Sequence, residues 1–215
     1  MNFFDLLSES VPREARTGRI YGAVVGLVTN NQDPDGMGRI KVKFPWLSDV
    51  AESSWARLAS PMAGKQRGIY FLPEVDDEVL VVFEHGDVRF PYVLGALWNG
   101  QDAPPVTNDN GKNDVRLIKS RSGHVVKLND EDGKETIEII DKDQKNSIVI
   151  DTSKSTITVT SDKDITLSAA QGTIKLDAQK VEINSSDATK LKAGGNMNVE
   201  ASGTMTVKGS TVNIN

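Results

Sequence analysis

Cysteine is absent from this chain of 215 residues, and histidine occurs only twice. The chain can therefore form no disulfide framework, thiolate nucleophile or cysteine zinc site, and two separated histidines are a weak metal signature. We expect no metal or other cofactor. No apolar run approaches the roughly 18–20 residues that span a bilayer, and the first residues lack the basic flank and apolar core of a secretory signal. These absences predict a soluble protein that is made in the cytoplasm.

Basic residues are also in the minority, with 25 Lys and Arg against 30 Asp and Glu, for a formal net charge of −5. Binding to a nucleic-acid backbone needs a concentrated basic surface. The charge balance therefore argues against a dedicated DNA-binding or RNA-binding protein, and no nucleic-acid partner is expected.

Aromatic residues and prolines are missing from the second half of the chain. The last aromatic is Trp98 and the last proline is Pro105. Such a change of composition marks a domain boundary, and the polar, Gly- and Pro-containing stretch after Trp98 is typical of a linker. We predict an N-terminal arm or short amphipathic helix at 1–17, a first domain at 18–100, a linker at 101–114 and a second domain at 115–215.

The first domain contains short strand-like runs that are separated by turn residues. These runs are residues 20–29, 38–44, 54–58, 78–84 and 88–94. Apolar residues alternate with basic ones in 39–44, which places the apolar side chains on one face of a strand. Five short strands with aromatic residues for a compact core predict a small β-barrel such as an OB-fold. An SH3-like barrel fits the same counts almost as well.

The second domain is a repeat in which two apolar residues flank one polar residue. The first members of the pairs recur at a mean spacing of 8.0 residues, and a weak repeat lies near Leu191. The predicted core residues are Ile148 and Ile150, Ile157 and Val159, Ile165 and Leu167, Ile174 and Leu176, Val181 and Ile183, Met197 and Val199, Met205 and Val207, and Val212 and Ile214.

Each repeat predicts one short strand and a polar corner, with both apolar side chains on the inner face. No single repeat can bury its apolar face, so the strands must stack into a β-solenoid with a narrow core. Two arrangements remain open. One chain can supply all three faces of a triangular coil, about 15 Å high, or three chains can supply one face each, about 43 Å high, at roughly 4.8 Å per stacked strand. The short coil would leave exposed edges at both ends, which modestly favours the trimer.

Several motifs resemble one family. They are 26–34 (GLVTNNQDP), 38–47 (GRIKVKFPWL), 54–57 (SWAR), 72–79 (LPEVDDEV), 91–99 (PYVLGALWN) and 119–124 (KSRSGH). In this order they resemble the spike proteins of contractile injection systems: phage baseplate assembly protein V, phage tail spikes, and VgrG proteins of type VI secretion systems. The resemblance runs from about Gly18 to the C-terminus.

The resemblance implies an all-β homotrimer, in which an N-terminal OB-fold barrel precedes an intertwined, triple-stranded β-helix. Such a spike joins a baseplate hub to a tip protein and pierces the target envelope, with transient membrane contact, and it is expelled on firing. Only about 17 residues precede Gly18, so the hub is expected to be a separate protein. The stretch after Trp98 is too short for the lysozyme domain of some phage spikes, and the His-x-His iron motif of others is missing.

Other candidate sites have a structural explanation that we prefer. His85 falls in a turn between two strands, and His124 precedes a strand. The acidic cluster 76–78 could bind a cation or supply paired carboxylates, but adjacent turn residues point in different directions. Residues 129–133 resemble part of a calcium loop without its later bidentate glutamate. Each of these is expected to be a turn.

The basic residues Arg39, Lys41 and Lys43 form a stripe beside aromatic residues. OB-folds can use such stripes for single-stranded nucleic acid. In an acidic chain we expect a solvated strand face or an interface with the hub instead.

We therefore predict a non-enzymatic, trimeric spike. The alternative is an OB-fold module that binds carbohydrate or degrades cell walls and carries a solenoid tail. The C-terminal end is expected to bind a separate PAAR-like tip protein, since its last apolar pair would leave open strand edges. The predicted tip-binding residues are Thr211, Val212, Asn213, Ile214 and Asn215.

Overall fold

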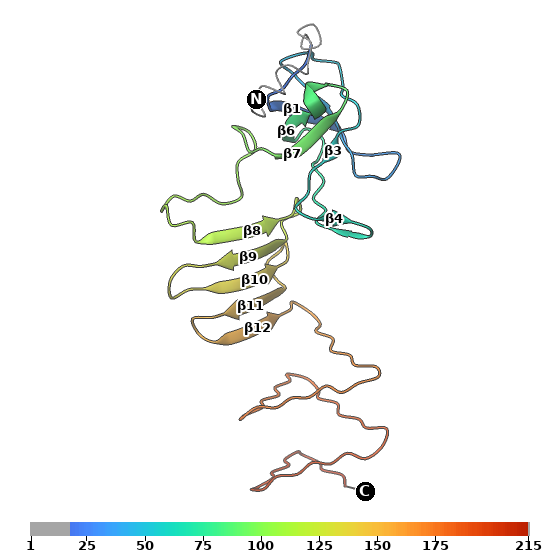
Figure 1. The fold of residues 1–215 in the computed structure, drawn as a ribbon. Coiled ribbons are helices and arrows are strands. Elements are labelled where there is room, and N and C mark those ends of the chain that lie inside the picture. The colour runs from blue at the N-terminus through green and yellow to red at the C-terminus, as the bar shows by residue number, and fades with distance from the viewer. Residues whose placement is uncertain (1–17, 215) are drawn as a thin grey trace, which may run out of the picture. The chain divides into compact units, whose positions relative to one another are not determined.

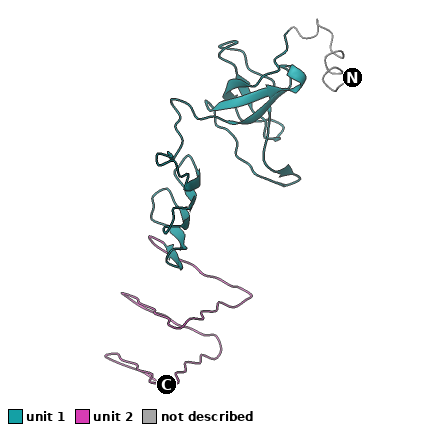
Figure 2. Cartoon of the chain, turned by 60° about the vertical axis from the view of Figure 1, so that its left-hand side comes forward, with its two compact units in different colours: residues 1–160 teal, residues 161–215 magenta. Residues whose placement is uncertain are grey.

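The computed structural model describes residues 18–214, and the chain divides into two units, residues 1–160 and 161–215 (Figure 2). The predicted arm or helix at 1–17 lies outside the described residues, as does Asn215. Within residues 18–214 the helical structure is limited to the short 3₁₀ turn η2 (Glu84–Gly86). The predicted all-β class is therefore confirmed. None of the described residues forms a helix that is long and apolar enough to cross a membrane.

The first part of unit 1 is a five-stranded barrel (Figure 1). Its strands are β1 (Val24–Asn30), β2 (Lys41–Lys43), β3 (Arg57–Leu58), β6 (Glu78–Phe83) and β7 (Pro91–Ala96). They pair in the order β2-β1-β6-β7-β3, and only the β3–β7 pair is parallel. Ile40 and Ala56 exchange two backbone hydrogen bonds of 2.7 and 3.0 Å, which join the β2 end of the sheet to the β3 end. These bonds close the barrel, as the OB-fold prediction required.

The barrel core consists of the inward side chains of these strands. Val79, Val81 and Phe83 are buried on β6, whereas the residues between them are half-buried. The same alternation buries Ile40 and Val42, which confirms the strand that the pattern in 39–44 predicted. The other fully buried core residues are Val28, Ala56 and Val93.

The observed strands differ from the predicted runs mainly at their ends. Residues 88–90 form a turn, in which the Phe90 amide donates to the Asp87 carbonyl over 3.0 Å, so β7 starts three residues later than expected. A small hairpin of β4 (Ala63–Gly64) and β5 (Arg67–Gly68) was not predicted. Its strands are two residues long and contain no apolar alternation that a sequence pattern could reveal.

The rest of unit 1 is an antiparallel meander, which Figure 1 shows as five stacked strands. The strands are β8 (Val115–Lys119), β9 (Val125–Asn129), β10 (Thr136–Ile140), β11 (Ser147–Asp151) and β12 (Thr156–Thr160). Each pairs only with its neighbours in the chain, over five residue pairs. The first two predicted core pairs, Ile148/Ile150 and Ile157/Val159, therefore lie on hairpin strands that are completed within one chain.

Unit 2 has a different character, because the described residues 161–214 form no strand ladder within the chain. Figure 2 shows this segment winding through successive open turns. The sequence predicted one repeating architecture for 115–215, whereas the structure divides this region at Thr160. Five-residue strands with tight turns pair within the chain before this point, and shorter repeats with polar corners follow it.

Candidate assembly surface

One face of the meander is apolar and uncovered. The cross-strand pairing aligns its side chains in two rows, both running across the sheet from β8 to β12. The first row is Ile118, Val126, Ile139, Ile148 and Val159, and the second is Leu128, Ile137, Ile150 and Ile157, with Arg116 at its β8 end. The nine apolar side chains are between 37% and 72% exposed. A contiguous apolar face of this kind marks an interaction surface.

The opposite face of the meander mixes polar residues with half-buried apolar ones, which are Val115, Leu117, Val125, Ile140 and Val149. Lys127 Nζ lies 3.2 Å from Glu138 Oε1 on the neighbouring strand, and Thr136 Oγ1 donates to the same carboxylate over 2.6 Å. The Thr136 hydrogen bond, followed by the lysine, lowers the pKa of Glu138. The apolar residues of the first face are thus the more exposed ones, which makes that face the stronger candidate for an interaction surface.

Tight turns hold the meander together in a single chain. In the β11–β12 turn, Asp151 accepts hydrogen bonds from Lys154 and Ser153, which lower the pKa of Asp151 to about 2. In the β8–β9 turn, Gly123 has a φ of 104°, a conformation that glycine adopts without strain. Beside it, His124 Nδ1 accepts the backbone N–H of Lys142 over 3.2 Å. His124 thus holds two turns together, in line with the preferred structural role.

The apolar pairs of 161–214 show a regular pattern of exposure. The first members, among them Ile165 and Met205, are 48–56% exposed, and the second members up to Val207 are 66–71% exposed. Leu191 is 73% exposed and so matches the second members. The weak repeat therefore has Leu191 in the second position and Thr189 in the first, and the steps from Ile165 to Val212 become 9, 7, 8, 8, 8 and 7 residues.

Charged residues of this segment lie between the apolar ones. Lys175 pairs with Asp177 over 2.9 Å, and Lys180 pairs with Glu182. In extended backbone, residues two apart share a face. Both charged pairs consequently share the face opposite their apolar neighbours, which leaves the apolar pairs together on the other face.

The predicted tip-binding residues continue this pattern as far as they are described. Val212 is 48% exposed, like the other first members, but Ile214 at 90% is more exposed than any other second member. Asn215 lies outside the described part of the chain.

The acidic cluster and the calcium-like segment are both turns. The Asp76 amide donates to the Val28 carbonyl over 2.9 Å, and Asp77 Oδ2 accepts the amide of Glu74 over 2.8 Å. Residues 129–133 connect β9 to β10, where Lys134 neutralises Glu131 at 2.6 Å. Among residues 18–214 no group of three or more potential metal ligands comes together.

The second histidine, His85, belongs to the barrel and lies in η2 with a φ of 49°. Its carbonyl oxygen accepts a hydrogen bond of 2.8 Å from Arg19. His85 is therefore part of the β6–β7 turn, as predicted.

The basic stripe of the barrel is largely neutralised by neighbouring acids. Arg39 pairs with both Asp33 and Asp35, and Lys41 lies 3.2 Å from Glu52. Both cations also lie within 6 Å of the Trp55 ring. Two of the three cations of the stripe, Arg39 and Lys41, are thus paired within the barrel.

Asp33 is the most fully engaged carboxylate of the barrel, with a side chain only 3% exposed. It accepts two hydrogen bonds from the Arg39 guanidinium and further ones from the amides of Asp35, Met37 and Arg39. Arg39, followed by these amides, holds the pKa of Asp33 well below its ordinary value, although partial burial opposes this shift. The sequence predicted turn residues between the runs 20–29 and 38–44, but not the contact of Asp33 with Arg39.

We expect Asp33→Asn to lower the melting temperature of the barrel by roughly 5 °C or more, because the amide cannot replace the charged, bidentate partner of Arg39. With a lowered pKa, Asp33 stabilises the fold above its ordinary pKa, near 4, and this stabilisation disappears as the pH falls further. The melting temperature of the variant should therefore depend less on pH between 2 and 5. Asp35→Asn is the control, since Asp35 is 64% exposed. Equal effects of the two substitutions would contradict this role of Asp33.

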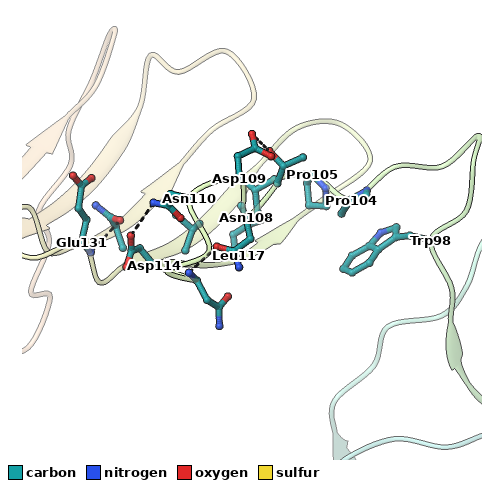
Figure 3. Close-up of a pocket in the computed structure, with 14 residues that line it drawn as sticks. Trp98, Pro104, Pro105, Asn108, Asp109, Asn110, Asp114, Leu117 and Glu131 are labelled. Atoms are coloured by element: carbon teal, nitrogen blue, oxygen red, sulfur yellow. Dashed lines mark hydrogen bonds between the residues drawn. The ribbon is translucent and has the colours of Figure 1, made fainter.

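A groove of about 790 Å³ lies along the linker between Trp98 and Glu131 (Figure 3). An exposed tryptophan beside amide side chains is the arrangement that the carbohydrate-binding alternative would need. However, these side chains hydrogen bond largely within the linker: Asn108 accepts the amide of Asn113 over 2.7 Å, and Asn110 donates to Asp114 over 3.3 Å. The groove lies along the turns of the linker, and its polar side chains hydrogen bond largely within these turns. This arrangement argues for a structural role of these side chains rather than for sugar binding.

Comparison with known protein families shows which domain family the barrel sequence matches. Residues 24–98 match the type VI secretion system/phage-baseplate injector OB domain. This match assigns the barrel to the injector OB domains. Residues 143–215 match a second family, DUF2345, described as an uncharacterized protein conserved in bacteria. This second match extends across the boundary at Thr160 and covers most of the apolar repeats.

Individual relatives agree with this assignment. The chain is 31% identical over 104 residues to the actin cross-linking toxin VgrG1 of Vibrio cholerae, which is 46% of this chain and 10% of that protein. It is 35% identical over 92 residues to the spike protein VgrG3 of Vibrio cholerae, covering 41% and 9% of the two chains. It is also 35% identical over 102 residues to VgrG5 of Pseudomonas aeruginosa, covering 44% and 13%. The VgrG-like chain thus spans about a tenth of the length of these relatives.

Proposed function

We propose that this VgrG-like chain is the homotrimeric central spike of a contractile injection apparatus. The observation that carries this proposal is that one chain leaves apolar surface uncovered in both units. In unit 1 this surface is one face of β8–β12, and in unit 2 it is the apolar pairs from Ile165 to Ile214, which form no strand ladder among the described residues. Three chains arranged about an axis would cover the sheet faces and supply the missing ladders, because exposed strand edges and apolar faces both recruit further chains.

In this proposal the role of the trimer is mechanical and involves no catalysis. The sheath of the apparatus supplies the work, and a rigid needle of residues 115–215 transmits it to the target envelope. Intertwined strands suit this task, since removing one strand requires breaking its ladders with both neighbouring chains. The injector OB domain would sit on a separate baseplate hub, and the spike would be expelled with the tube.

The simplest test is the mass of the full chain in solution. Three chains of 23.4 kDa predict a particle of about 70 kDa, elongated and resistant to heat or SDS. Light scattering coupled to size exclusion measures this mass directly. A compact particle of a single chain would contradict the proposal.

The tip-binding role of residues 211–215 belongs to the same proposal. It is supported by the resemblance to injection-system spikes and by the high exposure of Ile214. A conical tip protein of the PAAR kind would cover Val212 and Ile214 and hydrogen bond to the strand edges, with one tip bound to each trimer.

We expect deletion of residues 211–215 to abolish capture of the tip protein and to leave the trimer intact. Because apolar burial would supply most of the affinity, capture by the full chain should change little between low and high salt. Co-purification with the tip protein, together with the mass of the trimer, checks both expectations. A deletion variant that captures the tip as well as the full chain would show that the tip docks elsewhere.

A further inference from the structure

The repeats of 161–214 are too similar to one another to define a unique alignment of several chains. Their first members are separated by only 7 to 9 residues and are aliphatic or methionine, except for Thr189. A strand that slips by one residue turns its apolar side chains to the wrong face. A slip by one whole repeat keeps every pair on the correct face and loses only the contacts at the ends. Some other part of the chain must therefore set the alignment.

The meander has the properties that such an alignment device needs. Its ladders are complete within one chain, so it can form before any chain meets another, and local hairpins form rapidly. Its apolar face is a single block that covers five strands and has defined ends. At β8 this block ends in Arg116, which pairs with Asp130 rather than with an apolar residue.

We propose that the apolar face of β8–β12 is the surface through which three chains first associate, and that this association sets the register in which residues 161–214 intertwine. This inference rests on the proposed trimer. Displacing one meander along the axis relative to its neighbours would expose part of the block and bring Arg116 against aliphatic side chains, so a single alignment is favoured.

A second copy of this chain is the occupant that the surface fits best. The face presents branched aliphatic residues alone across four strands, with no charge that would select a different partner. In the sequence it is followed by the apolar pairs that begin at Ile165, which in the proposed trimer take strands from other chains. The same symmetric association would thus cover both surfaces.

The test compares two variants of the full chain that each lose two apolar side chains. Ile137→Thr with Ile139→Thr alters the meander face, and Ile174→Thr with Leu176→Thr alters the repeats. All four residues are exposed in a single chain, so neither variant should unfold it, and far-ultraviolet circular dichroism verifies this. Ser202→Cys, at a polar corner of the cysteine-free chain, carries a spin label in each variant and in the otherwise unchanged chain.

After dilution from denaturant, the meander variant should form trimers about tenfold more slowly, because the altered contacts form early. Its trimers should give a broad distribution of label distances by pulsed electron paramagnetic resonance. The repeat variant should associate at nearly the unaltered rate and keep the single distance of a symmetric, aligned trimer. Loss of the trimer in the meander variant alone would also support the inference.

Equal rates and a single label distance in both variants would overturn the inference, as would equal loss of the trimer in both. Either result leaves the proposed function standing if the chain labelled only at position 202 is a trimer. A labelled chain that stays monomeric would overturn the proposed function itself, and this inference with it.

Discussion

Replacing Ile165 by aspartate is expected to eliminate the trimer at neutral pH. In the proposed needle the first members of the apolar pairs face the common axis, so each trimer would bury three carboxylates close together. Burying one unpaired charge costs several kcal/mol, and like charges around one axis add to this cost. Ile165 belongs to the first apolar pair of 161–214, so it has repeats of this segment on one side only to offset such a penalty. Val181→Asp should act in the same way.

The dependence of this effect on pH follows from the same burial. A carboxyl group in an apolar core has a raised pKa, because burial disfavours its charged form. The Ile165→Asp trimer should therefore be most stable in acid, where the group is protonated, and should weaken as the pH rises through the raised pKa. Light scattering between pH 4 and 8 would follow the change from trimer to single chains.

Thr166→Asp is the matched control, since Thr166 lies between Ile165 and Leu167 and so occupies the opposite face of the extended chain. Position 182, between Val181 and Ile183, already carries a glutamate that pairs with Lys180. A charge at position 166 should thus leave the trimer and its melting temperature nearly unchanged. If Ile165→Asp leaves them unchanged as well, the apolar pairs do not face the axis and the assigned register is wrong.

The injector OB domain should respond strongly to Ile40→Ala while the rest of the chain does not. Ile40 is fully buried and closes the barrel through its hydrogen bonds with Ala56. Truncation of a buried isoleucine to alanine costs about 2–5 kcal/mol, a large part of the roughly 5–15 kcal/mol that stabilises a domain. We expect the barrel to melt roughly 8 °C or more lower, at about 4–8 °C per kcal/mol for a domain of this size.

Because no aromatic residue follows Trp98, the unfolding of the two domains can be measured separately by fluorescence and circular dichroism. All three tryptophans lie at or before Trp98, so tryptophan fluorescence reports only the OB domain and its linker. Far-ultraviolet circular dichroism also detects the needle. The fluorescence transition of Ile40→Ala should shift to lower temperature while the later transition of the needle remains. Ile40→Val removes one methyl group and should cost about 0.5–1.5 kcal/mol. Equal shifts of both transitions would show that the domains unfold as one unit.

Several features of this protein could be predicted from its sequence because they depend on local periodicity. Alternation in 39–44 located a barrel strand, since a strand that packs one face against a core must place apolar residues at every second position. The first two apolar pairs of the repeat, Ile148/Ile150 and Ile157/Val159, located the strands β11 and β12. The motif at 91–99 carried the family resemblance that the match of residues 24–98 confirms.

Other features depended on which distant residues meet, and no local pattern contains that information. Closure of the barrel requires Ile40 to pair with Ala56, and the bidentate contact between Asp33 and Arg39 requires the loop between them to fold back. Similarly, a run such as Ile148 to Ile150 has the same pattern whether its ladder partner is in the same chain or in another one. In the tertiary structure, tight turns pair the strands of 115–160 within one chain and no such pairing follows Thr160. The sequence alone therefore determined the apolar alternation of the strand at 39–44 and of β11 and β12, whereas the turn geometry decided which strands pair with one another within the chain.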